Sequence, residues 1–253
     1  MSRRNNRSYN RTDNNITNKT NNTHHKTNIV DINSYRKPIK KDVVLLPKNK
    51  LQEKYIDALE NPEIHIVFGH GYAGSGKTYL ATLYAIQCLK NGTIDKVVVT
   101  RPNIAVDDKD IGYLPGDILK KMSPWTKPVL DVFEEYYTTK ELTSMIEENV
   151  IELVPMAYLR GRTFKNSIIL LDEAQNTTQS SMLSALTRIG ENSKMIVTGD
   201  TKQSDRGKIN GLSDFLKRFT DQHNHIAVCY FDRKSIERHP IITDILKLYG
   251  EEI

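Results

Sequence analysis

One stretch decides the fold that this 253-residue chain is expected to adopt: Gly71-Tyr72-Ala73-Gly74-Ser75-Gly76-Lys77-Thr78. It fits the pattern of a phosphate-binding loop, which is a glycine, four residues and then Gly-Lys-Ser/Thr. A short apolar run of strand type precedes it at residues 64–68, and apolar residues at helical spacing follow it at 79–86. The N–H groups of such a loop and the positive end of the following helix attract an anion. The stretch therefore predicts a site for a nucleoside triphosphate.

The residues of this loop have separate expected tasks. All eight positions are expected to contact the nucleotide, and Lys77 is expected to reach its outer phosphates and to act in catalysis. The Thr78 hydroxyl is expected to bind Mg²⁺. An ordinary glycine-rich turn before a helix is the alternative, and the joint presence of strand, helix, lysine and threonine argues against it.

An acidic pair is expected to form the second half of the site. Asp172 and Glu173 follow the unbroken apolar run 168–171, which is typical of a buried parallel strand. Asp172 is expected to hold Mg²⁺ through its water shell, together with Thr78. Glu173 is then free to act as a general base or to orient the attacking water. A pair of surface acids at a strand end is the alternative.

A third polar cluster, Thr198, Asp200 and Gln203, follows the strand predicted at 194–198. Gln203 is expected to sense the terminal phosphate or to hold the lytic water, and a solvated glutamine beside an Asp-turn is the alternative. Arginines that could stabilise developing charge occur at three places, and spacing does not choose among them: Arg101, Arg160 with Arg162, and Arg238.

Strands and helices are predicted to alternate along most of the chain. Runs of strand type lie at 64–68, 96–100, 150–154, 167–171, 194–198 and 225–231, and helical patterns lie at 50–59, 79–89, 180–189, 212–219 and 241–249. Residues from about 105 to 149 are interpreted as a helical insertion with a short helix after Asp117 and two longer helices, 124–137 and 139–148. The alternation predicts an α/β fold with a doubly wound, mostly parallel sheet that binds its ligand at the carboxyl ends of the strands.

The charge is unevenly distributed along the chain. Residues 1–50 hold 12 Lys/Arg and 3 Asp/Glu, a net charge of +9, whereas the other residues hold 24 and 28, a net charge of −4. Residues 1–42 are rich in Asn, Thr and Arg, so they are predicted to be a disordered basic extension before a domain at 43–253. Contact with RNA and a merely solubilising tail both remain open for this extension.

Composition excludes several classes of protein. The sequence has no apolar run near 18 residues and no signal region after Met1, so neither a membrane partner nor secretion is expected. The two cysteines, Cys88 and Cys229, lie in apolar stretches, which argues against a disulfide framework or a zinc site. A cytoplasmic location fits these features.

The ordered set of motifs resembles the PhoH family of cytoplasmic ATPases, which is related to the superfamily 1 helicase core. The matching pieces span about residues 47–249: Gly71 to Thr78, Thr100-Arg101-Pro102, Gly112 to Asp117, Arg160-Gly161-Arg162-Thr163, Asp172-Glu173-Ala174-Gln175-Asn176, Gly199-Asp200 with Gln203, and Arg238-His239-Pro240. Two departures stand out. Tyr72 replaces a proline that is common in the family, and Asp205-Arg206-Gly207 replaces its usual Asp-Leu-Pro.

The resemblance implies a RecA/helicase-like P-loop domain that hydrolyses ATP with Mg²⁺ and acts on RNA or single-stranded nucleic acid. It also implies that Gln52 reads adenine, that Gln203 senses phosphate and that Arg238 is the arginine of the last helicase-like motif. After residue 203 the sequence has only about fifty residues, too few for a second core domain. We therefore expect Arg238 to complete the site of a neighbouring subunit in a homo-oligomeric ring, expected to be a hexamer.

Two other functions remain as alternatives. A thymidine-kinase-like phosphoryl transferase also pairs a phosphate loop with an Asp-Glu-x-Gln strand end, but such kinases carry a four-cysteine zinc lobe that two distant cysteines cannot build. A nucleotide-switched binding module with little turnover is the other alternative, and Glu173 argues against it.

Overall fold

The computed structural model describes residues 42–102, 118–205, 209–220 and 223–237, together with Ile241, Ile245 and Leu248, and the side chains of 118–124 are outside this description. The chain divides into two units, Met1–Lys37 and Pro38–Ile253, and all described residues belong to the second. Nearly all of the predicted extension at 1–42, and most of the helix predicted at 241–249, therefore lie outside the described residues.

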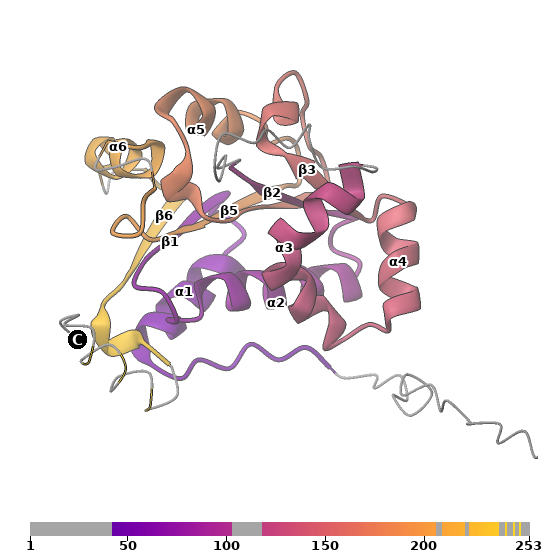
Figure 1. Ribbon diagram of the computed structural model, residues 1–253, viewed down its shortest axis with the longest axis horizontal. Coiled ribbons are helices and arrows are strands. Elements are labelled where there is room, and N and C mark those ends of the chain that lie inside the picture. The colour runs from indigo at the N-terminus through magenta and orange to yellow at the C-terminus, as the bar shows by residue number, and fades with distance from the viewer. Residues whose placement is uncertain are drawn as a thin grey trace, which may run out of the picture. The chain divides into compact units, whose positions relative to one another are not determined.

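A parallel sheet of six strands forms the centre of this unit (Figure 1). In chain order the strands are β1 (Ile66–Gly71), β2 (Lys96–Arg101), β3 (Ile151–Pro155), β4 (Ser167–Leu171), β5 (Lys194–Gly199) and β6 (Ile226–Phe231). Their spatial order is β3-β2-β4-β5-β1-β6, and every pair of neighbours is parallel. Every residue of β4 and β5 is buried, which explains why both read as continuous apolar runs rather than alternating ones.

Helices cover both faces of the sheet. The helices are α1 (Lys50–Glu60), α2 (Lys77–Lys90), α3 (Ile118–Glu134), α4 (Thr139–Glu147), α5 (Gln179–Leu186) and α6 (Gly211–Arg218). Figure 1 shows α5 and α6 on one side of the sheet and α1, α2 and α3 on the other. The predicted doubly wound α/β class is therefore confirmed.

Neighbouring residues of each strand pack into different cores, because successive side chains of a strand point to opposite faces. On β1, for example, Val67 packs with α1, α2 and α3, and Phe68 packs with α5 and α6. Phe68 also stacks on Phe215 of α6, with ring centroids 4.1 Å apart. Because a packed core covers each face of the sheet, the strand ends that carry the loops at its carboxyl edge are held in place.

Helix α3 differs from the prediction. Two helices were expected between Asp117 and Tyr137, but one helix runs through Pro124 and Pro128. A proline inside a helix removes one N–H donor and crowds the preceding turn. Pro128 lies on the exposed side of α3, while Leu130 and Phe133 of the same helix are buried in the core. Packing of the apolar face outweighs the local preference for a break.

None of the described helices has the length and the hydropathy needed to span a bilayer.

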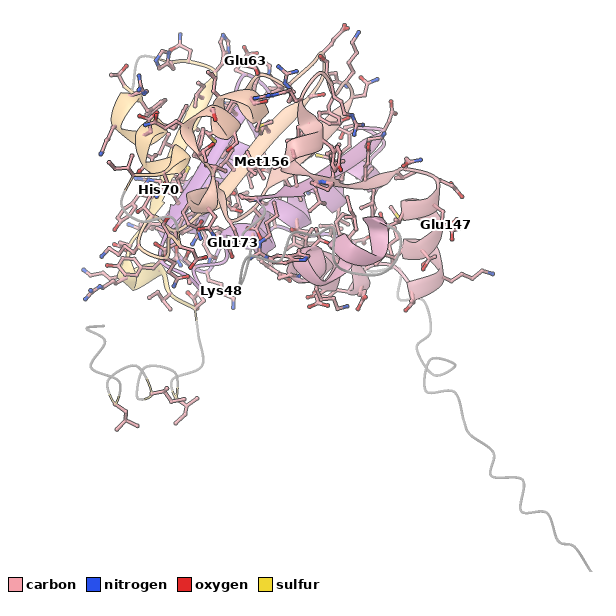
Figure 2. The ribbon with its side chains drawn as sticks, turned by 45° about the horizontal axis from the view of Figure 1, so that its top comes forward. Lys48, Glu63, His70, Glu147, Met156 and Glu173 are labelled. Atoms are coloured by element: carbon pink, nitrogen blue, oxygen red, sulfur yellow. The ribbon has the colours of Figure 1, made fainter. Side chains whose placement is uncertain are left out.

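His70, the residue of β1 before the phosphate loop begins, predicts a dependence of stability on pH (Figure 2). Burial, followed by the nearby charge of Lys77, lowers the pKa of His70 from 6.5 to about 4. Between these values the unfolded chain binds a proton that the folded chain does not, so the free energy of unfolding decreases as the pH falls. We expect His70 to contribute a loss of about 1 to 2 kcal/mol between pH 7 and pH 5.

Denaturant unfolding at the two pH values measures this effect, with His70→Phe as the matched variant. Phenylalanine keeps an aromatic ring beside Tyr230, whose ring centroid is 5.1 Å from that of His70. The variant should lose less stability at pH 5 than the parent chain. An equal loss in both proteins would show that His70 is not the responsible group.

Candidate functional site

The predicted phosphate loop connects β1 to α2, and all three of its glycines, Gly71, Gly74 and Gly76, have conformations that other residues rarely adopt. Gly71 has a φ of 126°, and a Cβ atom there would lie 2.1 Å from the carbonyl oxygen of Phe231 on β6. Gly76, which caps α2, has a φ of 84°. A side chain at either position would strain the backbone, and at Gly71 it would also separate β1 from β6. This explains the glycine spacing of the loop.

Lys77 lies inside the curve of this loop. Its buried ammonium donates to the carbonyls of Gly71 at 2.9 Å and Tyr72 at 2.6 Å, and to the Ser75 hydroxyl at 3.2 Å. The loop carbonyls thus hold a single positive charge beside the N-terminus of α2. This arrangement concentrates positive potential where a phosphate chain would lie.

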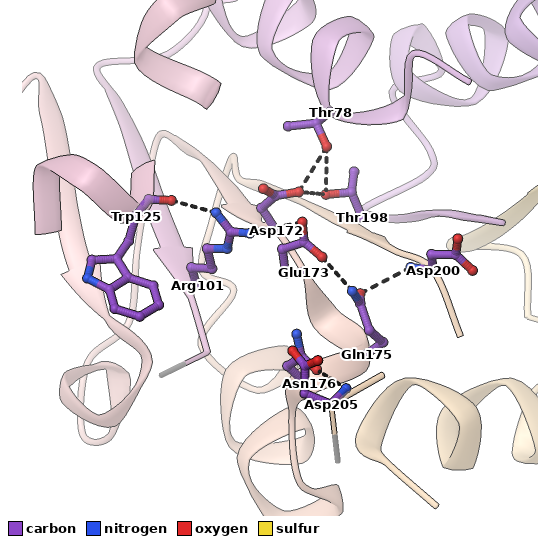
Figure 3. A network of polar contacts seen from close by, with 10 residues as sticks. All are labelled: Thr78, Arg101, Trp125, Asp172, Glu173, Gln175, Asn176, Thr198, Asp200 and Asp205. Atoms are coloured by element: carbon purple, nitrogen blue, oxygen red, sulfur yellow. Dashed lines mark hydrogen bonds and ion pairs between the residues drawn. The ribbon is translucent and has the colours of Figure 1, made fainter. Parts of the chain in front are cut away.

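Asp172 joins the ends of three elements. Its Oδ1 atom accepts a hydrogen bond from Thr78 at the start of α2, at 2.9 Å, and one from Thr198 at the end of β5, at 2.6 Å (Figure 3). Thr78 and Asp172 are 94 residues apart in the chain. Their hydroxyl and carboxylate oxygens are hard ligands of the kind that Mg²⁺ takes, usually one or two from the protein with water and phosphate completing the shell. Among the described residues no group of three or more His, Cys, Asp or Glu lies so that it could hold a metal ion.

Glu173 follows Asp172 in a left-handed backbone conformation, with a φ of 55°. One of its carboxylate oxygens pairs with Nη2 of Arg101 at 2.9 Å, and the other accepts a hydrogen bond from the amide of Gln175 (Figure 3). A non-glycine residue with positive φ persists only where its surroundings fix it, and such residues cluster at functional sites. The contacts with Arg101 and Gln175 therefore fix Glu173 just after the end of β4.

A cleft of about 270 Å³ opens at the carboxyl ends of β1, β4 and β5. It is lined by Ala73, Gly74, Gly76, Lys77, Thr78, Tyr79, Asp172, Glu173, Gly199, Asp200 and Gln203. The structure thus brings the loop, the acidic pair and the glutamine predicted to sense phosphate to one cavity. Three loop positions, Gly71, Tyr72 and Ser75, do not line it.

Gln52 lies behind the phosphate loop rather than in this cleft. The side chain is buried, its amide donates to the carbonyl of Ser75 at 3.1 Å, and its oxygen accepts from the N–H of Lys48 at 2.8 Å. The residue therefore supports the loop backbone. Its predicted contact with adenine is untested by these contacts and stays a prediction.

Tyr72 carries contacts that the sequence did not reveal. Its hydroxyl accepts hydrogen bonds from Lys202 at 2.6 Å and from Arg233 at 2.9 Å, and both cations lie near its ring. The bond from Lys202, followed by that from Arg233, lowers the pKa of Tyr72 below its ordinary value of 10.0. Tyr72 thus connects the phosphate loop to the segment that carries Gln203. No local pattern could have indicated a contact between residues so distant in the chain.

The candidate arginines occupy different surroundings. Arg162 pairs with both carboxylate oxygens of Glu152, at 2.6 and 3.0 Å, and packs on the ring of Phe164, so it has a structural task. Arg160 lines a second cleft of about 380 Å³. Arg238 lies outside the described residues, although the N–H of the preceding Glu237 donates to the carbonyl of Gly74 at 3.0 Å. The motifs at 112–117, 206–207 and 239–240 also lie outside the described residues.

A glycine-rich loop, an acidic strand end and a parallel sheet arranged in this way define a P-loop NTPase. A family model described as PhoH-like protein matches residues 44–250. The chain belongs to this family, as its motifs led us to expect.

Two similar proteins support this membership. The chain is 38% identical over 203 residues to a PhoH-like protein of Bacillus subtilis, a match that covers 79% of this chain and 62% of the relative. It is 37% identical over 210 residues to Protein PhoH of Escherichia coli, covering 81% and 58%. The chain thus spans about three fifths of the length of these relatives. Among solved structures, a Sulfolobus solfataricus SWI2/SNF2 ATPase core in complex with dsDNA is 13% identical with a TM-score of 0.41, covering 77% of this chain and 46% of that one.

Proposed function

We propose that this protein hydrolyses ATP in the cleft at the carboxyl ends of β1, β4 and β5. The observation that carries the proposal is the contact of Thr78 with Asp172 at 2.9 Å, in the same cleft as Lys77 and Glu173. This arrangement supplies a phosphate-binding cation, two oxygen ligands for Mg²⁺ and a carboxylate that could activate water.

Each residue has a defined part in the proposed reaction. The loop N–H groups and Lys77 bind the phosphates and draw negative charge toward the leaving oxygen. Thr78 and Asp172 would hold Mg²⁺, which would neutralise negative charge on the phosphates. Glu173 accepts a proton from the attacking water, and Gln203, which lines the same cleft, orients that water or senses the terminal phosphate.

The two alternatives receive less support from the site. The thymidine-kinase-like alternative also needs a four-cysteine zinc lobe, which the two cysteines Cys88 and Cys229 cannot build. A binding module without turnover would not need Glu173 fixed in a left-handed conformation at the cleft. Hydrolysis accounts for the fixed position of Glu173 at the cleft.

Two substitutions separate binding of ATP from its hydrolysis. Lys77→Ala should lose nucleotide binding, because Lys77 is expected to contact phosphate in the ground state. Glu173→Gln should still bind ATP but lose about 10²- to 10⁴-fold in turnover, because it removes the general base. Fluorescent-nucleotide titration and phosphate release measure the two properties. Hydrolysis at the parent rate by Glu173→Gln would show that another group activates the water.

We further propose that RNA or single-stranded nucleic acid is the partner of this ATPase. We also propose that the protein works in the cytoplasm. The first of these proposals is supported by the net charge of +9 on residues 1–50, because a basic chain segment attracts phosphates without regard to sequence. The other residues together have a net charge of −4, so the extension is the more favourable place for such contacts.

The salt dependence of nucleic-acid affinity tests whether the extension contributes to binding. Residues 1–28 hold 6 Lys/Arg. If all contact phosphates of a single strand, the slope of log affinity against log salt should be about −4, a loss of a few hundredfold between roughly 50 and 200 mM. The matched control replaces these basic residues by Gln and keeps the length of the chain. Equal slopes for both proteins would mean that the extension only solubilises.

We also propose that Arg238 completes the cleft of a neighbouring subunit in a ring. Among the described residues that line the cleft, Lys77 is the only cation, and an arginine added in this way can raise the rate by roughly 10³- to 10⁵-fold.

Mixing two inactive variants tests this proposal. An Arg238→Ala subunit still binds ATP and can receive an intact arginine from a Lys77→Ala neighbour, so activity should return when subunits exchange. Exchange is followed by energy transfer between labelled subunits. If exchange occurs and activity does not return, Arg238 acts within its own chain or has no part in the reaction.

A further inference from the structure

The side chain of Glu173 is held from two sides. Arg101, the last residue of β2, binds one carboxylate oxygen at 2.9 Å, and the amide of Gln175 binds the other. Figure 3 shows Arg101 and Trp125 on one side of Glu173, with Gln175 and Asp200 on the other. A carboxylate with both oxygens bound has a single orientation, which a free glutamate at the edge of a cleft would not have.

The guanidinium of Arg101 is itself fixed by a second contact. Its Nη1 atom donates to the carbonyl oxygen of Trp125 in α3 at 2.7 Å, while Nη2 binds Glu173. The planar guanidinium fork can make two such bonds in defined directions, which a lysine ammonium on a flexible stem cannot reproduce. Arg101 therefore links the backbone of α3 to the Glu173 carboxylate after β4.

Gln175 is equally constrained. It is buried, and its side-chain oxygen accepts the backbone N–H of Asp200 at 3.0 Å. A Cβ atom at Gly199 would lie 2.7 Å from that oxygen, so the strand end leaves room for Gln175 only because residue 199 is glycine. The amide thus ties Glu173 to the end of β5, the strand that precedes Gln203.

We propose that Arg101 is a positioning residue of the hydrolytic site, which acts by holding Glu173 toward the attacking water and which fixes this position relative to α3. The inference rests on the proposed hydrolysis with Glu173 as the base. Arg101 itself does not line the described cleft, and its only described link to the reacting atoms runs through Glu173. A misplaced base can lose about 10²-fold in rate even when it remains present.

A double-mutant cycle with the full chain tests the proposal. Arg101→Gln should lower kcat by about 10²-fold and leave KM for ATP within about twofold, because the base, and not the phosphate site, is displaced. In Glu173→Gln the same replacement should have no further effect on kcat, since the group through which Arg101 acts is already absent. Arg101→Lys should recover part of the lost kcat, because its ammonium can approach Glu173 but cannot also bind Trp125 in the same geometry.

The matched control is Arg218→Gln. Arg218 also pairs with a carboxylate, that of Asp214 at 2.9 Å, but the pair lies exposed on α6. This variant should keep the parent values of kcat and KM, and thermal unfolding of each variant confirms that the fold is retained.

Three outcomes would overturn the proposal, and they are distinguishable from one another. If Glu173→Gln is inactive while Arg101→Gln turns over at the parent rate, Arg101 has no positioning role and the proposed function stands. If Arg101→Gln lowers kcat by the same factor with and without Glu173, Arg101 acts independently of that residue. If Glu173→Gln hydrolyses ATP at the parent rate, the base assigned in the proposed function is wrong and the role of Arg101 is wrong with it.

Discussion

The contact of Asp172 with the hydroxyls of Thr78 and Thr198 is the interaction on which the site depends. The three residues come from the end of β4, the start of α2 and the end of β5, and they meet because β4, β5 and β1 are neighbours in the sheet. A buried carboxylate needs partners of this kind, because its desolvation is otherwise unfavourable. The same oxygen atoms are suited to binding Mg²⁺. The contact therefore stabilises the buried carboxylate and also brings together the ligands that the proposed reaction needs.

The parallel sheet explains why the functional groups gather at one edge. All its described strands point the same way, and β4 and β5 at its centre are buried along their whole length, so the polar side chains of the site gather where the central strands end. Lys77, Asp172, Glu173 and Gln203 all follow carboxyl ends of strands, and all line the same cleft. The two cores beneath keep these ends at fixed distances.

Residues outside the cleft hold its parts in place. Gln52 supports the loop from behind through Ser75, Tyr72 links the loop to Lys202, and Gln175 links the end of β4 to Asp200. These contacts join segments that would otherwise be independent loops at the sheet edge. A substitution that removes one of these hydrogen bonds is expected to weaken the others. The reason is that each bond fixes a segment next to a residue that lines the cleft.

The sequence by itself determined the phosphate loop, the six strands and the acidic pair, because these depend on local patterns: glycine spacing, continuous apolar runs and polar residues directly after them. Only the tertiary structure decided the strand order, the single helix through Pro124 and Pro128, and the partners of Glu173, Gln52 and Tyr72. Arg101 illustrates the limit. Its place at a strand end was visible in the sequence, but its pairing with Glu173 was not, since the two are joined only when β2 and β4 lie side by side. Contacts between distant segments follow from packing of the whole domain, which no local pattern records.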